Sequence, residues 1–212
     1  MRTRIILLLF VLVLSFAWFR SSGVWKRNRA MLTSNPQKHY TLQNLAIDKM
    51  KEKAIAAKRF TAQNRFDTLT CFFVDMSLPS GQNRFFVYDL GNDTIQNSGL
   101  VTHGRCNQYW LEGRKYGNTV GCGCTSLGKY KIGNPYNGRF GLAFKLYGLE
   151  NTNDKAFERF VVLHSHNCVP EKEVKEDICQ SDGCPTVSPS FLQDLKKIIT
   201  NSSKPILLWI YE

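Results

Sequence analysis

The sequence predicts a strand-dominated α+β domain, and three observations lead to this fold class. Short aromatic and β-branched runs recur between residues 68 and 211, and such runs favour β-strands. Two segments, residues 41–60 and 188–199, instead show helical spacing or a helix start signal. The length of 212 residues and the hydrophobic content of 43% fit one folded domain with attached segments.

The first predicted element is a helix from Thr41 to about Phe60. Thr41 is a residue type that caps helices, and apolar residues follow it at near-helical spacing. We expect this helix to pack on a sheet edge. The alternative is an amphipathic helix on a membrane surface, because four lysines lie between residues 49 and 58. The apolar face of this helix lacks large aromatic residues, however.

The strands follow in order. Residues 68–76 and 84–90 predict a β-hairpin, because a Leu-Pro-Ser-Gly-Gln-Asn turn joins two aromatic runs. Asn134–Gly138 predicts a turn from its Asn-Pro and Asn-Gly pairs. Ser188 and Pro189 predict a helix start that leads to about Ile199. Further strands are expected at residues 95–102, 129–132, 140–147, 160–163 and 205–211, the last of them buried.

Positive charge is concentrated near the N-terminus. The formal net charge is +11, but residues 1–60 hold 12 Lys and Arg against 2 Asp and Glu, and residues 61–212 hold 16 against 15. The two parts therefore carry +10 and +1. A nucleic-acid-binding domain would keep a positive stripe on its folded part, so we expect no nucleic-acid partner. The composition also excludes a disordered chain, a collagen and a multi-span membrane protein.

Residues 1–22 predict a segment that takes the chain out of the cytoplasm. An uncharged apolar run from Ile5 to Phe19 lies between Arg4 and Arg20, which fits a secretory signal peptide or an uncleaved membrane anchor. Either would place the rest of the chain in the periplasm or cell envelope, and an anchor would hold it at the membrane. Residues 23–40 predict a basic linker, and residues 41–66 an N-terminal helix that packs on the domain.

Cysteines outside the cytoplasm usually form disulfides, and an odd number leaves at least one free thiol. Cys168 and Cys179 flank a polar loop that a disulfide could close. Cys106 could pair with Cys122 or with Cys124. A zinc site is the competing hypothesis, but Cys122 and Cys124 are separated by one residue and no second pair follows, so we expect no metal. The seven cysteines are at positions 71, 106, 122, 124, 168, 179 and 184.

Cys184 is the candidate for a reactive thiol. Gly183 precedes it and permits a tight turn and a close approach of substrate. The strand-like run before it ends at His164, 20 residues upstream. A thiol nucleophile needs a base within hydrogen-bonding distance, so these two residues predict cysteine–histidine chemistry. A disulfide at Cys184 and a structural role for His164 are the alternatives.

Three ordered motifs resemble the L,D-transpeptidase catalytic (YkuD-type) family. Thr125–Ile132 is similar to its T-P-x-G-x-[FY]-x-[IV] segment, and His164 followed by Ser181–Cys184 is similar to its H-x(n)-[ST]-H-G-C signature. Together with Val101–Gly104, these motifs resemble a divergent Gram-negative branch. The resemblance covers residues 68–212 and implies a β-sandwich-like catalytic domain over residues 67–212. It also implies a cysteine enzyme that acts on peptidoglycan stem peptides without a cofactor.

The resemblance also implies roles for individual residues. Cys184 corresponds to the nucleophile and His164 to the base, which would take the thiol proton and later protonate the leaving amine. A carbonyl such as that of Ser165 would orient the imidazole. Backbone N–H groups at Gly183 and Cys184 would hold the oxyanion, and Ser181 would shape the turn.

Two positions depart from the family pattern. Asp182 stands where the family has histidine, and its charge should disfavour a thiolate at Cys184. Pro185 and Thr186 follow the cysteine where the family has Arg or Asn. His103 is a candidate for a compensating cation or a substrate contact, or a structural residue before a glycine turn. His166 should point the same way as His164 if the strand continues, as a partner of that ring or as a solvated side chain.

The sequence therefore predicts an exported L,D-transpeptidase-like enzyme that forms a thioester at Cys184 and transfers the acyl group to an amine. An L,D-carboxypeptidase, with water as the acceptor, is the enzymatic alternative. A non-catalytic, disulfide-stabilised wall-binding module, with Cys184 paired, is the alternative of a different class.

Overall fold

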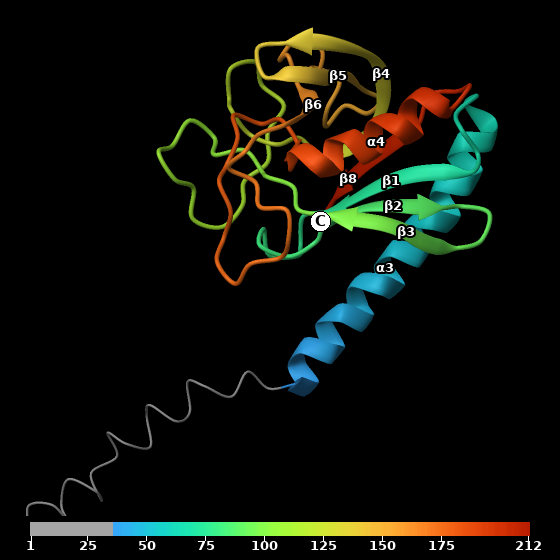
Figure 1. Ribbon diagram of the computed structural model, residues 1–212, viewed down its shortest axis with the longest axis horizontal. Coiled ribbons are helices and arrows are strands. Elements are labelled where there is room, and N and C mark those ends of the chain that lie inside the picture. The colour runs from blue at the N-terminus through green and yellow to red at the C-terminus, as the bar shows by residue number, and fades with distance from the viewer. Residues whose placement is uncertain (1–35) are drawn as a thin grey trace, which may run out of the picture. The chain divides into compact units, whose positions relative to one another are not determined.

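The computed structural model describes residues 36–212, with side chains from residue 45 onward. It confirms a strand-dominated α+β fold (Figure 1). Residues Ala46–Glu212 form one compact unit. The described elements are α3 (Pro36–Gln63), β1 (Thr70–Asp75), β2 (Phe85–Asp89), β3 (Thr94–Gly99), β4 (Gly128–Gly138), β5 (Gly141–Gly148), β6 (Val162–Ser165), β7 (Thr186–Val187), α4 (Pro189–Asn201) and β8 (Leu207–Tyr211).

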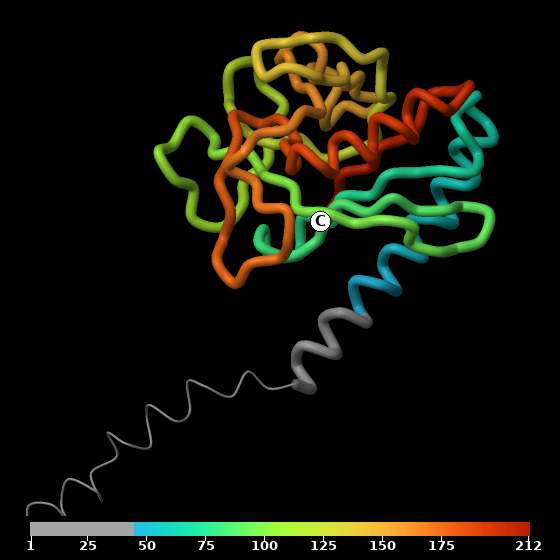
Figure 2. The backbone as a smooth tube through the Cα atoms, viewed as in Figure 1, coloured from blue at the N-terminus to red at the C-terminus, as the bar shows by residue number. Residues whose placement is uncertain are grey.

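The strands form one mixed sheet in the order β3-β2-β1-β8-β4-β5-β6-β7. β1 and β2 pair as the predicted antiparallel hairpin. β8 pairs in parallel with β1 and antiparallel with β4, so one strand joins the two halves of the sheet. Figure 2 traces this order, with the red C-terminal segment beside the cyan-green β1.

The C-terminal part of α3 packs on a face of the sheet, not on an edge as expected. Met50, Ala54 and Ala57 are buried in a cluster with Phe73 of β1 and Tyr211 of β8. The predicted start at Thr41 is wrong, because the helix begins at Pro36. Proline is favoured in the first helical turn, where its missing N–H costs no hydrogen bond.

α4 covers the opposite face. The predicted cap is confirmed, since the Ser188 side chain accepts a hydrogen bond from the Phe191 amide and Pro189 occupies the first turn. The Phe191 ring meets Phe85 of β2 edge to face at 5.3 Å. β1 alternates accordingly, with Phe72 in the α4 cluster and Phe73 in the α3 cluster.

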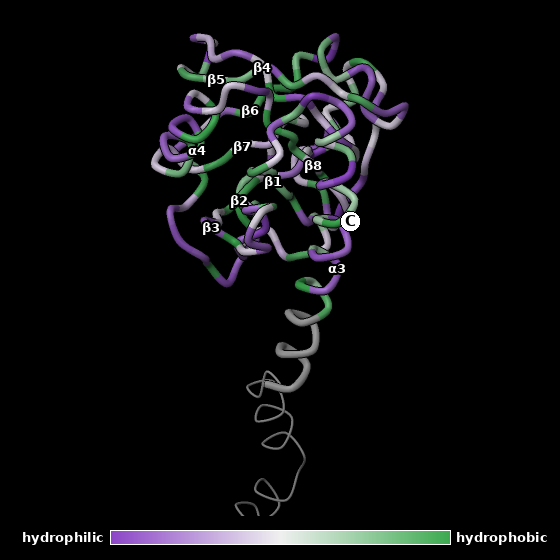
Figure 3. Tube along the Cα trace, turned by 90° about the vertical axis from the view of Figure 1, so that its right-hand side faces the viewer, coloured by the Kyte–Doolittle hydropathy of each residue, from purple (hydrophilic) through white to green (hydrophobic). Residues whose placement is uncertain are grey.

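The sandwich-like character comes from the second half of the sheet. Tyr130 of β4, Phe144 of β5 and Leu163 of β6 share one buried cluster with α4 and with Phe72 of β1. Both halves of the sheet therefore contribute to the core around α4. In Figure 3 the outer loops contain long hydrophilic stretches, as expected when the strands supply the core.

The turn predicted at Asn134–Gly138 is wrong. These residues extend β4, and the register shifts between Ile132 and Pro135. A bulge accommodates the proline, which has no N–H to donate to a ladder. The chain instead reverses at Gly138–Gly141, where Gly141 has a φ of +80°.

The predicted leader at residues 1–22 and residues 23–35 of the predicted linker lie outside the described residues. Residues 36–40, predicted as the end of the linker, belong to α3 instead. Within residues 36–212, no helix combines the length and apolarity that crossing a bilayer requires.

Candidate active site

Strand pairing brings the two predicted catalytic residues into the same region. β6 and β7 pair in parallel with His164 opposite Thr186. Cys184 lies two residues before Thr186, so it lies level with Val162 at the amino end of the strand that carries His164.

A tight turn precedes Cys184. The Ser181 hydroxyl donates to the Cys184 carbonyl at 2.7 Å and accepts from the Gly183 amide at 3.2 Å. Gly183 has a φ of +109°, and a Cβ there would lie 2.7 Å from the carbonyl oxygen of Cys124. Glycine is therefore required both for the backbone conformation and for the close approach.

The Cys184 thiol is free and partly exposed. Its sulfur accepts from the Val162 amide at 3.5 Å and donates to the Phe160 carbonyl at 3.7 Å. Phe160 adopts a left-handed φ of 57° and its side chain is 84% exposed. Burial raises the pKa of the thiol, the Val162 N–H and Arg159 lower it, and Asp182 raises it. Because the net shift is upward, the resting group is a thiol.

His164 is held at both ring nitrogens. Nδ1 lies 3.1 Å from the Ser165 carbonyl, the partner expected from the sequence, and Nε2 lies 3.1 Å from Oγ1 of Thr186. A carbonyl only accepts, so Nδ1 carries the proton and Nε2 offers a lone pair. Burial lowers the pKa of His164, so the ring is neutral near pH 7. No hydrogen bond between described atoms joins His164 to Cys184.

Phe140 covers the His164 ring. It stacks on that ring at 4.8 Å between centroids and 15° between planes, and meets His166 edge to face at 6.1 Å. His166 Nδ1 accepts from the Cys168 amide at 3.1 Å. The tip of the β4–β5 hairpin therefore contacts both histidines of the β6 segment.

The His103 ring lies against Arg84, not against the thiol. Nη2 of Arg84 is 3.1 Å from Nδ1 of His103. Burial, followed by Arg84 and Arg114, lowers the pKa of His103 to about 4. The ring is therefore uncharged near neutral pH and cannot supply the compensating cation. Its backbone carbonyl accepts from the Ser181 amide at 2.9 Å, which ties this segment to the cysteine turn.

Asp182 is exposed and forms an ion pair with Arg105, with 2.7 Å between Oδ1 and Nε. Arg105 therefore partly offsets the negative charge expected to disfavour the thiolate.

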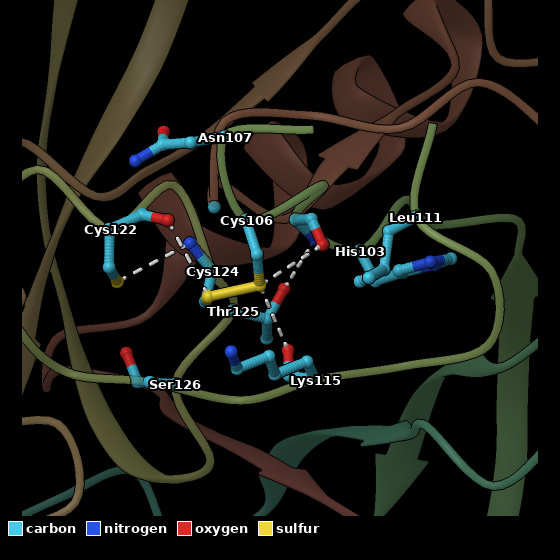
Figure 4. The surroundings of a disulfide bond; sticks show 12 residues. His103, Cys106, Asn107, Leu111, Lys115, Cys122, Cys124, Thr125 and Ser126 are labelled. Atoms are coloured by element: carbon cyan, nitrogen blue, oxygen red, sulfur yellow. Dashed lines mark hydrogen bonds between the residues drawn. A yellow bond between two sulfur atoms is a disulfide. The ribbon is translucent and has the colours of Figure 1, made fainter. Parts of the chain in front are cut away.

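Two disulfides hold the loops around the site. Cys168–Cys179 and Cys106–Cys124 are both formed, which confirms the first predicted pair and selects Cys124 as the partner of Cys106. Among the described cysteines, positions 71, 122 and 184 are free. Figure 4 shows Cys122 beside the Cys106–Cys124 bond, with its sulfur accepting from the Cys124 amide at 3.4 Å.

The described residues contain no group of three or more His, Cys, Asp or Glu side chains placed to hold a metal ion.

Residues 41–211 match the family model of the L,D-transpeptidase catalytic domain. The chain belongs to this family. The match includes the N-terminal helix as well as the sheet and the Cys184 turn. No curated protein matches the sequence.

Solved structures with a similar fold include the helical cell shape determining protein Pgp2 (K307A mutant) from Campylobacter jejuni, at 14% identity and a TM-score of 0.45, with 68% of this chain and 47% of that chain covered. An L,D-transpeptidase from Xylanimonas cellulosilytica has 13% identity, a TM-score of 0.39 and coverage of 67% and 60%. An L,D-transpeptidase from Mycobacterium smegmatis has 11% identity, a TM-score of 0.42 and coverage of 68% and 59%. The chain thus spans about half to three fifths of these relatives.

Three contacts at the site were not predicted from the sequence. Thr186 contacts His164, Arg159 reaches the Cys124 carbonyl, and Phe140 stacks on His164. The only available signal was the place of Thr186 two residues after the cysteine, where the motif departs from the family. The other two contacts depend on loop positions that carry no periodic pattern.

Proposed function

We propose that the protein is a cysteine acyltransferase that acts on peptidoglycan stem peptides, with Cys184 as the nucleophile and His164 as the base. The observation that supports this most directly is the free thiol of Cys184 two residues before Thr186, the residue paired with His164 across β6 and β7 and in contact with its Nε2. Four cysteines of the surrounding loops are meanwhile paired, and Cys122 is free. Membership of the L,D-transpeptidase family supports the substrate class.

The first half-reaction would form a thioester. His164 Nε2 takes the proton of the Cys184 thiol as sulfur attacks the carbonyl carbon between an L- and a D-centre. The N–H group of Cys184 is the candidate donor to the resulting oxyanion. The Gly183 N–H, also expected in this role from the sequence, donates to the Ser181 hydroxyl at 3.2 Å. The tetrahedral intermediate collapses with cleavage of the C–N bond, and His164 returns the proton to the leaving amine.

The second half-reaction would reverse the roles. His164 removes a proton from the acceptor amine as its nitrogen attacks the thioester carbonyl. The C–S bond then breaks, a new amide forms, and Cys184 regains its proton. With water as the acceptor, the same steps give a carboxylic acid and an L,D-carboxypeptidase.

The resting site holds a neutral pair. The pKa of Cys184 is raised and that of His164 is lowered, so thiol and imidazole face substrate uncharged at pH 7. The Thr186 hydroxyl lies at Nε2 and must give way or relay the proton before His164 can accept it. Deprotonation would therefore accompany substrate attack rather than precede it.

We further propose that the protein works in the periplasm or cell envelope, where peptidoglycan is found. The two disulfides support an oxidising compartment, and the apolar run at residues 5–19 supports export through a signal or an anchor.

The test is a muropeptide assay with the purified full chain, read by liquid chromatography and mass spectrometry. The parent protein should release the terminal D-residue of a tetrapeptide stem and form L,D-cross-links, while Cys184→Ala should lose both activities. Cys122→Ala is the matched control, because Cys122 is also a free and partly exposed cysteine. Unchanged activity in Cys184→Ala would refute the mechanism.

The same assay separates the alternatives. Trimmed tripeptide without cross-links would favour the carboxypeptidase. Binding to insoluble peptidoglycan with no product, combined with a Cys184 disulfide in mass spectra under oxidising conditions, would favour the wall-binding module.

A further inference from the structure

Arg159 directly precedes Phe160–Val162, the segment whose backbone contacts the Cys184 thiol. The next residue, Phe160, accepts from that thiol, and Val162 donates to its sulfur at 3.5 Å. Arg159 therefore belongs to the wall of the site, yet no sequence motif singles it out.

The Arg159 guanidinium donates three hydrogen bonds to the Gly117–Ser126 loop. Nη1 donates to the Gly117 carbonyl at 2.9 Å and to the Ser126 hydroxyl at 2.8 Å, and Nη2 donates to the Cys124 carbonyl. All three acceptors lie on the loop that the Cys106 disulfide fixes at Cys124. Three bonds from one planar fork give the side chain a defined position.

This position places the charge directly behind the cysteine turn. A Cβ built on Gly183 would lie 3.3 Å from Nη2 of Arg159. The guanidinium thus lies beside the turn that leads to the Cys184 N–H, the candidate oxyanion donor. Its three acceptors are neutral, so they do not cancel its charge.

The other charged groups nearby are paired or face elsewhere. Asp182 is bound to Arg105 at 2.7 Å. Within residues 45–212, no carboxylate lies within 4.0 Å of the Arg159 guanidinium. A positive charge without a counterion in a partly buried site acts over a longer distance than one paired in solvent.

We propose that Arg159 is a positioning residue of the acyl-transfer site, which holds the Gly117–Ser126 loop against the cysteine turn and supplies the positive charge beside the Cys184 thiol. This rests on the proposed function of Cys184. The charge favours sulfur as it becomes anionic in the attack, and it favours the oxyanion that follows. The lowering of the Cys184 pKa by Arg159 agrees with this assignment.

The experiment measures alkylation of Cys184 in the full chain by iodoacetamide between pH 6 and pH 11, quantified on the Cys184 peptide by mass spectrometry. In Arg159→Gln the apparent pKa of the thiol should rise by about one unit, so that the rate at pH 8 falls about tenfold. Arg159→Lys, which keeps the charge and loses the fork, should stay closer to the parent protein. Arg159→Met replaces Arg159→Gln if the latter does not fold.

Lys155→Met is the matched control. Lys155 is a cation of the same segment, 53% exposed and paired only with Glu158 at 3.8 Å, so its loss should leave the profile within about twofold of the parent. A parent-like profile in folded Arg159→Gln would overturn the proposal. An equal pKa rise in Arg159→Lys and Arg159→Gln would overturn the role of charge.

A second measurement needs no substitution. In the parent protein, anionic iodoacetate should alkylate Cys184 faster, relative to neutral iodoacetamide, than it alkylates the thiol of a short cysteine peptide. Equal ratios would contradict a positive charge at the thiol. None of these reactions uses peptidoglycan, so they can fail while the muropeptide assay succeeds, or succeed while it fails.

Discussion

The half of the domain around β1, β2 and β8 and the loops around Cys184 are stabilised by different interactions. Phe72 and Phe73 lie back to back on β1, both 0% exposed, and each packs into an apolar cluster with one of the two helices. The Cys184 turn is instead held by hydrogen bonds from the side chains of Ser181 and Thr102 to the Cys184 carbonyl. One region is fixed by burial and the other by polar contacts and disulfides.

We expect the two regions to contribute differently, one to the stability of the fold and the other to the reaction. Apolar burial provides most of the free energy of folding, so the sheet half should dominate the free energy of unfolding. Polar contacts give modest net stability but define geometry closely, so the loop half should dominate the reaction. Two free cysteines illustrate this. Cys71 is buried on β1, where burial raises its pKa well above the usual value, whereas Cys184 also faces an N–H donor and a cation.

The largest expected effect is on the free energy of unfolding, when a phenylalanine is replaced by alanine in each of the two regions. Phe72→Ala removes a fully buried ring that packs at 5.5 Å from Phe85 and should lower the free energy of unfolding by about 4 kcal/mol. Phe140→Ala removes a ring that is 51% exposed and should cost about 1 kcal/mol or less. Urea denaturation measures both. Acyl transfer per folded molecule should stay unchanged in Phe72→Ala and fall in Phe140→Ala, and the reverse pattern would break the comparison.

A somewhat smaller effect is expected from acid. The pKa of His103 is lowered from an ordinary value near 6.5 to about 4 in the folded protein. The unfolded chain therefore binds more protons between these values, so stability is complete above pH 6.5 and falls as the pH drops toward 4. The loss is up to about 3 kcal/mol for a shift of this size.

Urea denaturation of the parent and of His103→Asn from pH 7 to pH 4 checks this effect. The amide oxygen of Asn can replace Nδ1 as the acceptor from Arg84. The difference between the two curves removes the shared contribution of carboxylates such as Asp177, whose pKa is lowered mainly by the Ser80 hydroxyl. Parallel curves would show that His103 does not titrate in this way.

The smallest expected effect is at Thr186. Thr186→Val keeps the shape of this buried side chain but removes the hydroxyl that lies 3.1 Å from His164 Nε2. We expect a loss of about 1 kcal/mol in stability and a fall of about fivefold in acyl transfer, as one neutral hydrogen bond allows. Thr61→Val is the matched control, because Thr61 is also fully buried and bonds only to the Lys58 carbonyl at 3.1 Å. An equal fall in activity in the control would remove the special role of Thr186.

The same difference explains what the sequence could predict. The hairpin at β1 and β2, the capped helix α4 and the buried strand β8 were predicted because alternation, capping and apolar runs are local patterns. The extension of β4 was missed because the bulge at Ile132–Pro135 overrides the local turn signal of Asn134–Gly138.

The candidate site was proposed only where a motif marked it. Cys184 and His164 were proposed from the glycine before the thiol, the strand that carries the histidine and the resemblance to the family. The contact of the imidazole with the Ser165 carbonyl is confirmed. Arg159 was missed because its hydrogen-bond partners lie 33 to 42 positions away in the sequence. Phe140 was missed because the ring on which it stacks belongs to another strand. His103 was expected as a candidate cation, but no local pattern in the sequence places Arg84 beside its ring.

The position of β8 has a consequence for folding kinetics. Leu207 pairs with Cys71, which lies 136 residues earlier, and the same short strand also pairs with β4. Until residues 207–211 are in place, β1 and β4 each expose a row of unpaired backbone groups, and open edges of this kind promote intermolecular pairing. Contacts so distant in sequence also slow folding. A chain truncated before Leu207 should therefore aggregate through these two edges rather than fold into a smaller domain.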